Sequence, residues 1–143
     1  MSRIKIDLPG QFQFSTSIPI RITDVNYGNH VGNDSVLSII HEARMQFLKH
    51  YEYSELNVGG VGMIMKDVGI EFKAELFYGD VVLASVACTN FTSAGFDLYY
   101  KLEKEISGRR VTAAIARTGM ICYDYAKKKI VGVPAEAVDK LKL

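Results

Sequence analysis

The sequence predicts an α+β fold in which a curved antiparallel sheet wraps around one long central helix. One segment, residues 34–51, carries the apolar spacing of a long helix, and strand patterns lie on both sides of it. Four of these patterns follow the helix in succession with short turns between them, which is typical of an antiparallel meander and not of a parallel βαβ sheet. The length of 143 residues suits a single domain, residues 1–143.

The first predicted strand spans residues 12–22, where apolar and mostly polar side chains alternate. Pro19 has no N–H to donate to a ladder, so we expect this strand to lie at an edge of the sheet or to be bulged there. The segment TDVNYGNHVGND, residues 23–34, follows and is rich in Asn, Asp and Gly, which favour turns and helix caps. It is predicted to be a loop.

The central helix is predicted over residues 34–51, DSVLSIIHEARMQFLKHY, with Asn33 or Asp34 as its N-cap. Apolar side chains recur at helical spacing, and further apolar positions widen this stripe. So wide an apolar face is typical of a largely buried helix. The apolar positions are Val36, Leu37, Ile39, Ile40, Ala43, Phe47 and Leu48.

Strand patterns occupy most of the chain after a Gly-rich connection at residues 58–62. Turn signals separate the strands at residues 78–80, 93–95 and 107–108, and Pro134 opens a short terminal helix, AEAVDKL. One sheet covering one helix leaves open edges, which a second copy commonly covers, so we expect a homodimer or homotetramer. The four predicted strands are residues 63–73, 80–91, 96–106 and 110–124.

The composition excludes several classes of partner. Seventeen Lys and Arg against sixteen Asp and Glu give a net charge of +1, which provides no electrostatic footprint for nucleic acid. No apolar run approaches the ~20 residues needed to cross a bilayer, and MSRIKIDLPG lacks the apolar core of a secretory signal.

Cys88 and Cys122 lie in apolar runs and are expected to be free and buried, as in a cytoplasmic protein. No Cys/His motif indicates a metal.

Two stretches around the start of the helix carry a resemblance. RITDVNYGNHVGN, residues 21–33, followed by IHEAR, residues 40–44, resembles the hot-dog acyl-CoA thioesterases of the 4-hydroxybenzoyl-CoA thioesterase type. In that family a strand leads to a D-x-D-x-x-G-H-V-N-N-like loop and then to a central helix carrying E-A-R. IEFKAELFYGD, residues 70–80, and VGVPA, residues 131–135, continue the similarity. The resemblance implies a hot-dog fold and hydrolysis of an acyl-CoA or acyl-carrier-protein thioester, with no cofactor apart from the CoA of the substrate.

The loop departs from the family pattern at a position that matters for chemistry. The family's usual catalytic carboxylate is the second Asp of D-x-D, and this sequence has Asn26 there. A neutral amide can neither accept a proton nor attack as a carboxylate would. Asn29 replaces the Gly before His, and Gly32 replaces the first Asn after His-Val. Plant acyl-carrier-protein thioesterases, which look like relatives, combine Asp, Asn and His in this loop. The Asp of the plant enzymes falls at the position that Asn26 occupies here. The positions that do match the pattern of the 4-hydroxybenzoyl-CoA thioesterase type are Asp24, His30, Val31 and Asn33.

Four residues are candidates for catalysis. His30 could act as a general base, since a histidine has an unperturbed pKa of ~6.5, or could be a structural histidine of the loop. Asn26 could orient water or a carbonyl, or could stabilise a turn. Asn33 would offer a backbone N–H at the helix N-terminus to an oxyanion. Glu42 could orient His30, act as a base, or pair with Arg44 or with another chain. Asp24 is expected to fix the loop.

Two other functions remain open beside hydrolysis. Asp24-Val-Asn26 followed by His30 resembles the D-x-N-P-x-H of hot-dog enoyl-CoA hydratases, but the Pro is absent and the His is one residue further along. A protein that binds an acyl thioester with little turnover would explain Asn26 directly. We rank hydrolysis first.

Overall fold

The computed structural model describes residues 3–143 as one antiparallel sheet with a long helix. The predicted central helix is confirmed and begins one residue earlier, at Asn33. The first strand is shorter than predicted because the chain turns into a 3₁₀ helix at Ile22. The elements are β1 (Phe14–Pro19), η1 (Ile22–Asp24), α1 (Asn33–His50), β2 (Gly62–Phe72), β3 (Val81–Thr89), β4 (Gly95–Ile106), β5 (Arg109–Asp124), β6 (Lys129–Ile130) and α2 (Ala135–Leu141).

The strand order is β1-β3-β4-β5-β2, with β6 paired to the end of β5. The strands β3, β4 and β5 form the expected meander, and β1 is an edge strand, as Pro19 predicted. The expectation that β2 would pair with β3 was wrong, because β2 lies at the far edge beside β5. The connection over residues 73–80 is too long for a tight hairpin and carries the chain from one side of the sheet to the other.

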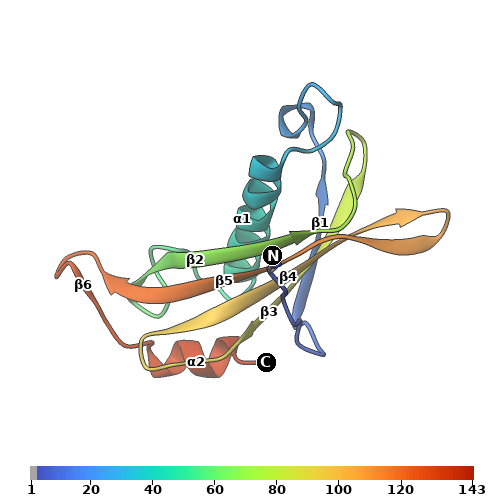
Figure 1. Ribbon diagram of the computed structural model, residues 1–143. Coiled ribbons are helices and arrows are strands. Elements are labelled where there is room, and N and C mark those ends of the chain that lie inside the picture. Colours follow the sequence, from blue (N-terminus) through green and yellow to red (C-terminus); the bar gives the residue numbers. More distant parts are fainter. Residues whose placement is uncertain (1–2) are drawn as a thin grey trace.

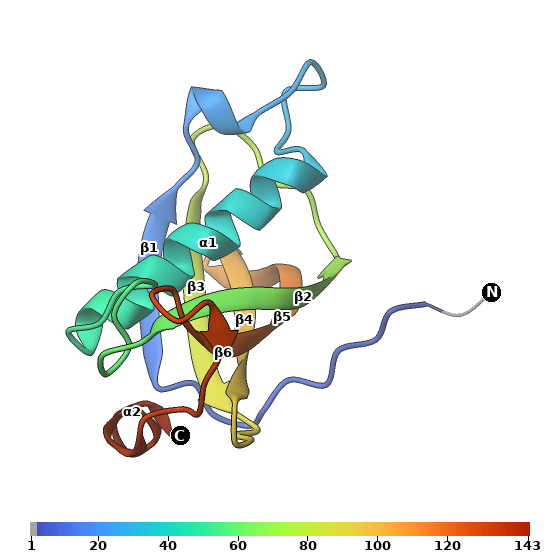
Figure 2. The ribbon, with the colours of Figure 1, turned by 90° about the vertical axis from the view of Figure 1, so that its left-hand side faces the viewer.

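Helix α1 lies across one face of the sheet (Figures 1 and 2) and contacts β1 and β3. Its side chains Ile40, Ala43 and Phe47 are completely buried, which agrees with the wide apolar face. Alternate residues of β4, including Leu98 and Leu102, complete the core from the sheet side. The predicted α+β architecture is therefore confirmed.

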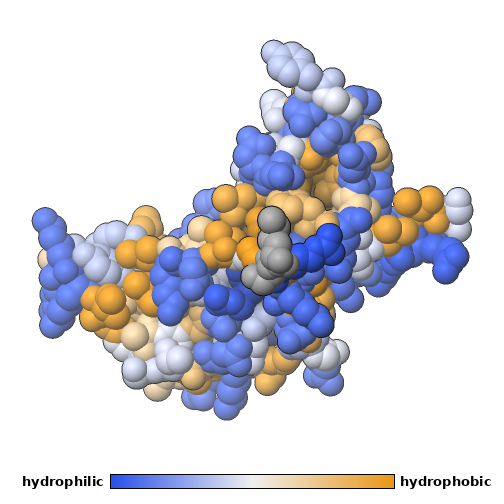
Figure 3. Space-filling view, in the orientation of Figure 1, coloured by the Kyte–Doolittle hydropathy of each residue, from blue (hydrophilic) through white to orange (hydrophobic). Residues whose placement is uncertain are grey.

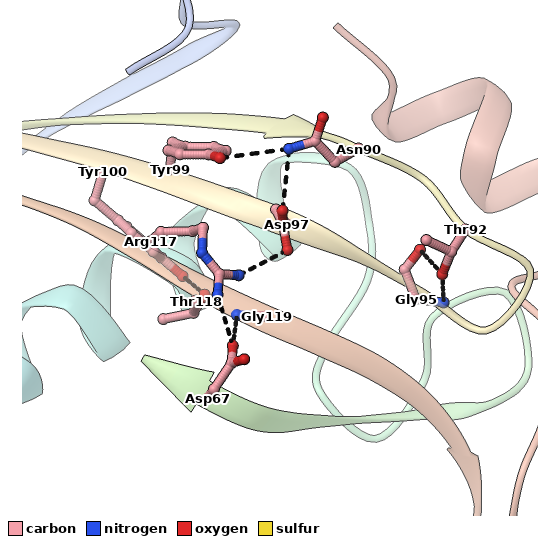
Figure 4. A network of polar contacts seen from close by, with 10 residues as sticks. All are labelled: Asp67, Asn90, Thr92, Gly95, Asp97, Tyr99, Tyr100, Arg117, Thr118 and Gly119. Atoms are coloured by element: carbon pink, nitrogen blue, oxygen red, sulfur yellow. Dashed lines mark hydrogen bonds and ion pairs between the residues drawn. The ribbon is translucent and has the colours of Figure 1, made fainter. Parts of the chain in front are cut away.

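A polar network joins three strands on the sheet (Figure 4). Arg117 of β5 donates from Nη1 to Asp97 of β4 at 2.9 Å and from Nη2 to Asp67 of β2 at 3.1 Å. Asp67 also accepts the backbone N–H of Gly119 at 3.1 Å, next to the irregularity between Met65 and Asp67. These contacts fix the register of β2 at its bulge.

The two cysteines agree with the sequence analysis, and the surface is of mixed character. Hydrophobic side chains are distributed among hydrophilic ones on the face shown in Figure 3. Cys88 and Cys122 are free and buried as expected, and burial raises the pKa of both thiols, so neither is a ready nucleophile at neutral pH. Within residues 3–143, no helix has the length and apolar character required to cross a bilayer.

Candidate active site

The loop between β1 and α1 closes on itself through backbone hydrogen bonds. Val25 and Val31 form an antiparallel bridge, and the N–H of Asn26 donates to the carbonyl of His30 at 3.0 Å. The Asn26 side chain accepts the N–H of Gly28 at 2.9 Å, so it stabilises a turn, which is one of the two roles expected for it. Asp24 is buried and accepts the N–H of Arg21 at 2.8 Å, which fixes the start of the loop as predicted.

The structure brings the side chains of Asn26 and His30 together over Gly28. A Cβ atom added to Gly28 would lie 3.0 Å from His30 Nε2 and 3.3 Å from Asn26 Oδ1. His30 Nδ1 lies 3.3 Å from the carbonyl oxygen of Val31, a contact that is a hydrogen bond when Nδ1 carries the proton. In that tautomer Nε2 is the basic nitrogen, and it faces the same space as the Asn26 amide.

The N-terminus of α1 lies beside this pair. Its N-cap is Gly32 and not Asn33 or Asp34 as expected, so no cap side chain takes up the first backbone N–H groups. Asn33 is the first helical residue, and its N–H group is among those that point out of the helix end. A Cβ on Gly32 would lie 3.6 Å from Asn26 Nδ2 and 2.7 Å from Asp34 Oδ1. The Asp34 carboxylate and the Asn26 amide therefore both lie close to Gly32, at the start of the helix.

A cleft of about 300 Å³ opens at this end of the helix. His30 and Asn33 line it on one side, and the chain segment that leaves β2 lines it on the other. That segment turns away from the sheet because the N–H groups of Lys73 and Ala74 both donate to the carbonyl of Ala113, at a bulge in β5. The apolar part of the lining is Val31, Val36, Phe72, Ala74, Leu76, Ala113 and Ala114.

The connection between β2 and β3 supports the loop directly. The N–H of Val31 donates to the carbonyl of Leu76 at 2.8 Å, and His30 forms an antiparallel bridge with Phe77. Both segments lie at the same end of the molecule, at the top of Figures 1 and 2. The position of the His30 backbone therefore depends on this connection.

Glu42 is not brought to the cleft within one chain. It lies nine residues along the helix from Asn33, a rise of about 13.5 Å. Its side chain is exposed, accepts a hydrogen bond from Gln46 at 2.7 Å, and lines clefts on the β1 side of the helix. The alternative that Glu42 pairs with Arg44 was wrong, because Arg44 pairs with Glu55.

Arg44 belongs to a buried polar network that sequence reasoning missed. Its Nε donates to Glu55 at 3.1 Å, and its Nη1 donates to the hydroxyl of Tyr100 at 3.2 Å, which lies 2.8 Å from the Thr118 hydroxyl. Burial alone would raise the pKa of Glu55, but hydrogen bonds and charges from His41 and Arg44 outweigh it and hold that pKa below its ordinary value. The sequence does contain one indication of this network. Arg44 places a charge inside the apolar face of the helix, four residues after Ile40 and four before Leu48.

Comparison with known proteins assigns the family. The family model of the thioesterase-like superfamily matches residues 20–141, nearly the whole chain and all of the loop described above. The chain belongs to the thioesterase-like superfamily. No curated protein matches this member of the superfamily.

Solved structures of thioesterases share the fold of this superfamily member. A thioesterase superfamily protein from Jannaschia sp. CCS1 matches with a TM-score of 0.81 at 14% identity, over 93% of this chain and 83% of that one. A 1,4-dihydroxy-2-naphthoyl-CoA thioesterase from Synechocystis matches with a TM-score of 0.79 at 21% identity, over 90% and 94%. A 4-hydroxybenzoyl-CoA thioesterase variant bound to 4-hydroxybenzoyl-CoA matches with a TM-score of 0.81 at 12% identity, over 90% and 98%. The hot-dog fold that the resemblance implied is thus confirmed.

Proposed function

We propose that this protein hydrolyses the thioester of an acyl-CoA or an acyl-carrier protein to a free acid and a thiol. This proposal rests on one observation. The side chains of Asn26 and His30 lie close together, near an uncapped helix N-terminus and beside one apolar cleft. Thioester hydrolysis needs these parts: a base for water, donors for the oxyanion and a space for the acyl group. Membership of the thioesterase-like superfamily supports the same reaction class.

In the proposed reaction the thioester carbonyl oxygen lies at the N-terminus of α1. Backbone N–H groups at Asn33 and Asp34 stabilise the negative charge that develops on this oxygen. Asn26 orients a water molecule, and His30 Nε2 accepts its proton as the water oxygen attacks the carbonyl carbon. The C–S bond then breaks, and the leaving thiolate takes the proton from the His30 imidazolium. The acyl group occupies the apolar part of the cleft.

Binding with little turnover is the second candidate, and the neutral amide at position 26 favours it. A structural neighbour supports this alternative, because a 4-hydroxybenzoyl-CoA thioesterase variant with Asn in place of one Asp is described in complex with 4-hydroxybenzoyl-CoA. That neighbour shares 12% identity with this chain.

A panel of acyl-CoA thioesters of increasing chain length, including aromatic acyl groups, separates the candidates. Release of free thiol supports hydrolysis, and saturable binding without thiol release supports the binding protein. Loss of enoyl absorbance with an enoyl-CoA would instead identify a hydratase. A carrier-protein thioester of the best acyl group, measured beside its CoA thioester, then identifies the preferred thiol.

We further propose that the protein assembles as a homodimer or homotetramer in the cytoplasm. Both edges of the sheet, β1 and β2, are open to another chain, and the edge strand β2 exposes Val68 and Phe72. The free, buried cysteines fit a reducing compartment. Sedimentation at micromolar concentration tests the assembly, and a stable monomer would contradict it.

A further inference from the structure

Lys104 is a buried lysine near the candidate site. On β4 the residues that face the helix side are Phe96, Leu98, Tyr100, Leu102 and then Lys104, so the lysine continues a row of large, mostly apolar side chains. It is 8% exposed, although a lysine is almost never buried unless it is paired. A buried ammonium without partners would be very unfavourable, so its contacts indicate what it does.

Among residues 3–143, the Lys104 ammonium makes its polar and aromatic contacts with one segment, residues 75–80. Nζ donates to the carbonyl of Glu75 at 2.7 Å and to Asp80 Oδ2 at 3.1 Å. It also lies 4.9 Å from the centroid of the Phe77 ring, within the range of a cation–π contact. A leucine at this position would fill the same space but would hold neither the carbonyl nor the carboxylate.

The segment held by Lys104 is the one that supports His30. Asp80 Oδ2, which accepts from Lys104, also accepts the N–H of Phe77 at 2.8 Å and so closes the turn. On its other side the same segment accepts the N–H of Val31 and bridges to His30. Lys104 is thus linked to the backbone of His30 through one short stretch of chain.

We propose that Lys104 is a positioning residue for the active site: it holds residues 75–80 so that His30 stays aligned with the helix N-terminus. This role rests on the proposed function, because it concerns the base of that reaction. Movement of the segment would separate a buried ammonium from its partners, and that cost keeps the segment in one place. Lys104 itself touches no reacting atom.

The test compares Lys104→Met with wild type and with a matched control. The Met side chain keeps most of the length of the lysine and removes its three donors. We expect kcat for the best substrate of the panel to fall by ~10- to 100-fold with a smaller change in KM, because a base displaced by about 1 Å loses rate at this scale. Lys104→Arg keeps the charge and donors and should recover most of the loss.

The control is Lys101→Met on the same strand. Lys101 also makes an ion pair, at 3.9 Å to Glu103, and a cation–π contact, at 5.3 Å to the Phe12 ring, but its side chain lies on the other face of β4. It should leave kcat and KM unchanged. Equal kcat losses in the two methionine variants would overturn the proposal.

Hydrogen exchange of the Val31 amide gives a readout that does not need turnover. In Lys104→Met this amide should exchange at least ~10-fold faster, while core amides of β4 and β5 keep their rates. Unchanged Val31 exchange together with unchanged kcat would overturn the role. If wild type hydrolyses no thioester, the proposed function fails, and the Val31 exchange still decides whether Lys104 holds the loop. If Lys104→Met does not fold, Asp80→Asn replaces it, with the same expected directions and the same contradicting result.

Discussion

Arg44 and Tyr100 are joined by a hydrogen bond of 3.2 Å inside the core, between the central helix and β4. This contact and the ion pair of Arg44 with Glu55 fasten the helix to the sheet and to the segment that follows it. The network lies within the fold and away from the cleft, so its effects should be on stability and not on the chemistry of the cleft.

Replacement of Arg44 by Met should destabilise the protein by about 1.5–3 kcal/mol, because hydrogen bonds to a charged group are lost and Glu55 keeps a partly buried charge. Denaturant unfolding measures the change. Arg117→Met is the matched control: this half-exposed arginine also pairs with two acceptors, yet its loss should cost about 1 kcal/mol or less. Equal losses in the free energy of unfolding for the two variants would contradict the larger contribution expected of the buried Arg44.

The same network should make stability fall in acid. The pKa of Glu55 is lowered in the folded protein, so the unfolded chain binds its proton first as the pH drops. The stabilisation is complete above the unfolded pKa of about 4.3 and is lost as the pH falls through the lower folded value. Unfolding midpoints from pH 7 to pH 3 should therefore decline less steeply for Glu55→Gln than for wild type. Parallel curves would exclude a contribution of Glu55.

His30→Ala should lower the hydrolytic rate by ~10²–10⁴, the usual contribution of a general base. His50→Ala, at the far end of the same helix, is the matched control and should change the rate little, because His50 packs against Phe14 and Tyr51 and does not line the site cleft. A His30→Ala variant that retains its rate within a few-fold would mean that another group, such as the Asp34 carboxylate, activates the water.

Asn26→Asp should fold, because an aspartate oxygen can still accept the N–H of Gly28. If His30 is the base, the new charge favours the imidazolium, and the acidic limb of the rate–pH profile should move to higher pH. If the protein mainly binds its ligand, the restored carboxylate should raise hydrolysis by ~10²-fold or more. Unchanged rates and an unchanged profile would mean that this loop is not the active site.

Gly28→Ala tests directly whether the reaction depends on the close approach of the Asn26 and His30 side chains. The new Cβ would lie 2.9 Å from His30 Cδ2, so the ring must shift. We expect kcat to fall by ~10- to 100-fold with little loss of stability, because the loop is exposed and the base is displaced. Gly10→Ala, where nothing lies within 4 Å of the added carbon, should behave as wild type. Wild-type kcat in Gly28→Ala would show that the position of the His30 ring does not limit the reaction.

Local patterns in the sequence determined the elements of this protein. The periodicity of residues 34–51 predicted α1 to within one residue, and the turn signals predicted β3, β4 and β5 to within two residues at every end. These features depend on neighbours a few positions apart, which the sequence displays directly. The same local reasoning indicated that Asn26 stabilises a turn, and this is what its bond to Gly28 does.

Only the tertiary structure decided which distant residues meet. It placed β2 beside β5, fixed Arg44 against Tyr100, separated Glu42 from the cleft, and set Lys104 against residues 75–80. Lys104 illustrates why the sequence did not predict these contacts. Its place in the alternation of β4 gives only the face of the sheet on which its side chain lies. Its partners in residues 75–80 reach that face because the connection from β2 must cross the end of the sheet to reach β3. Contacts of this kind depend on how the whole chain closes around the helix, and no short stretch of sequence encodes them.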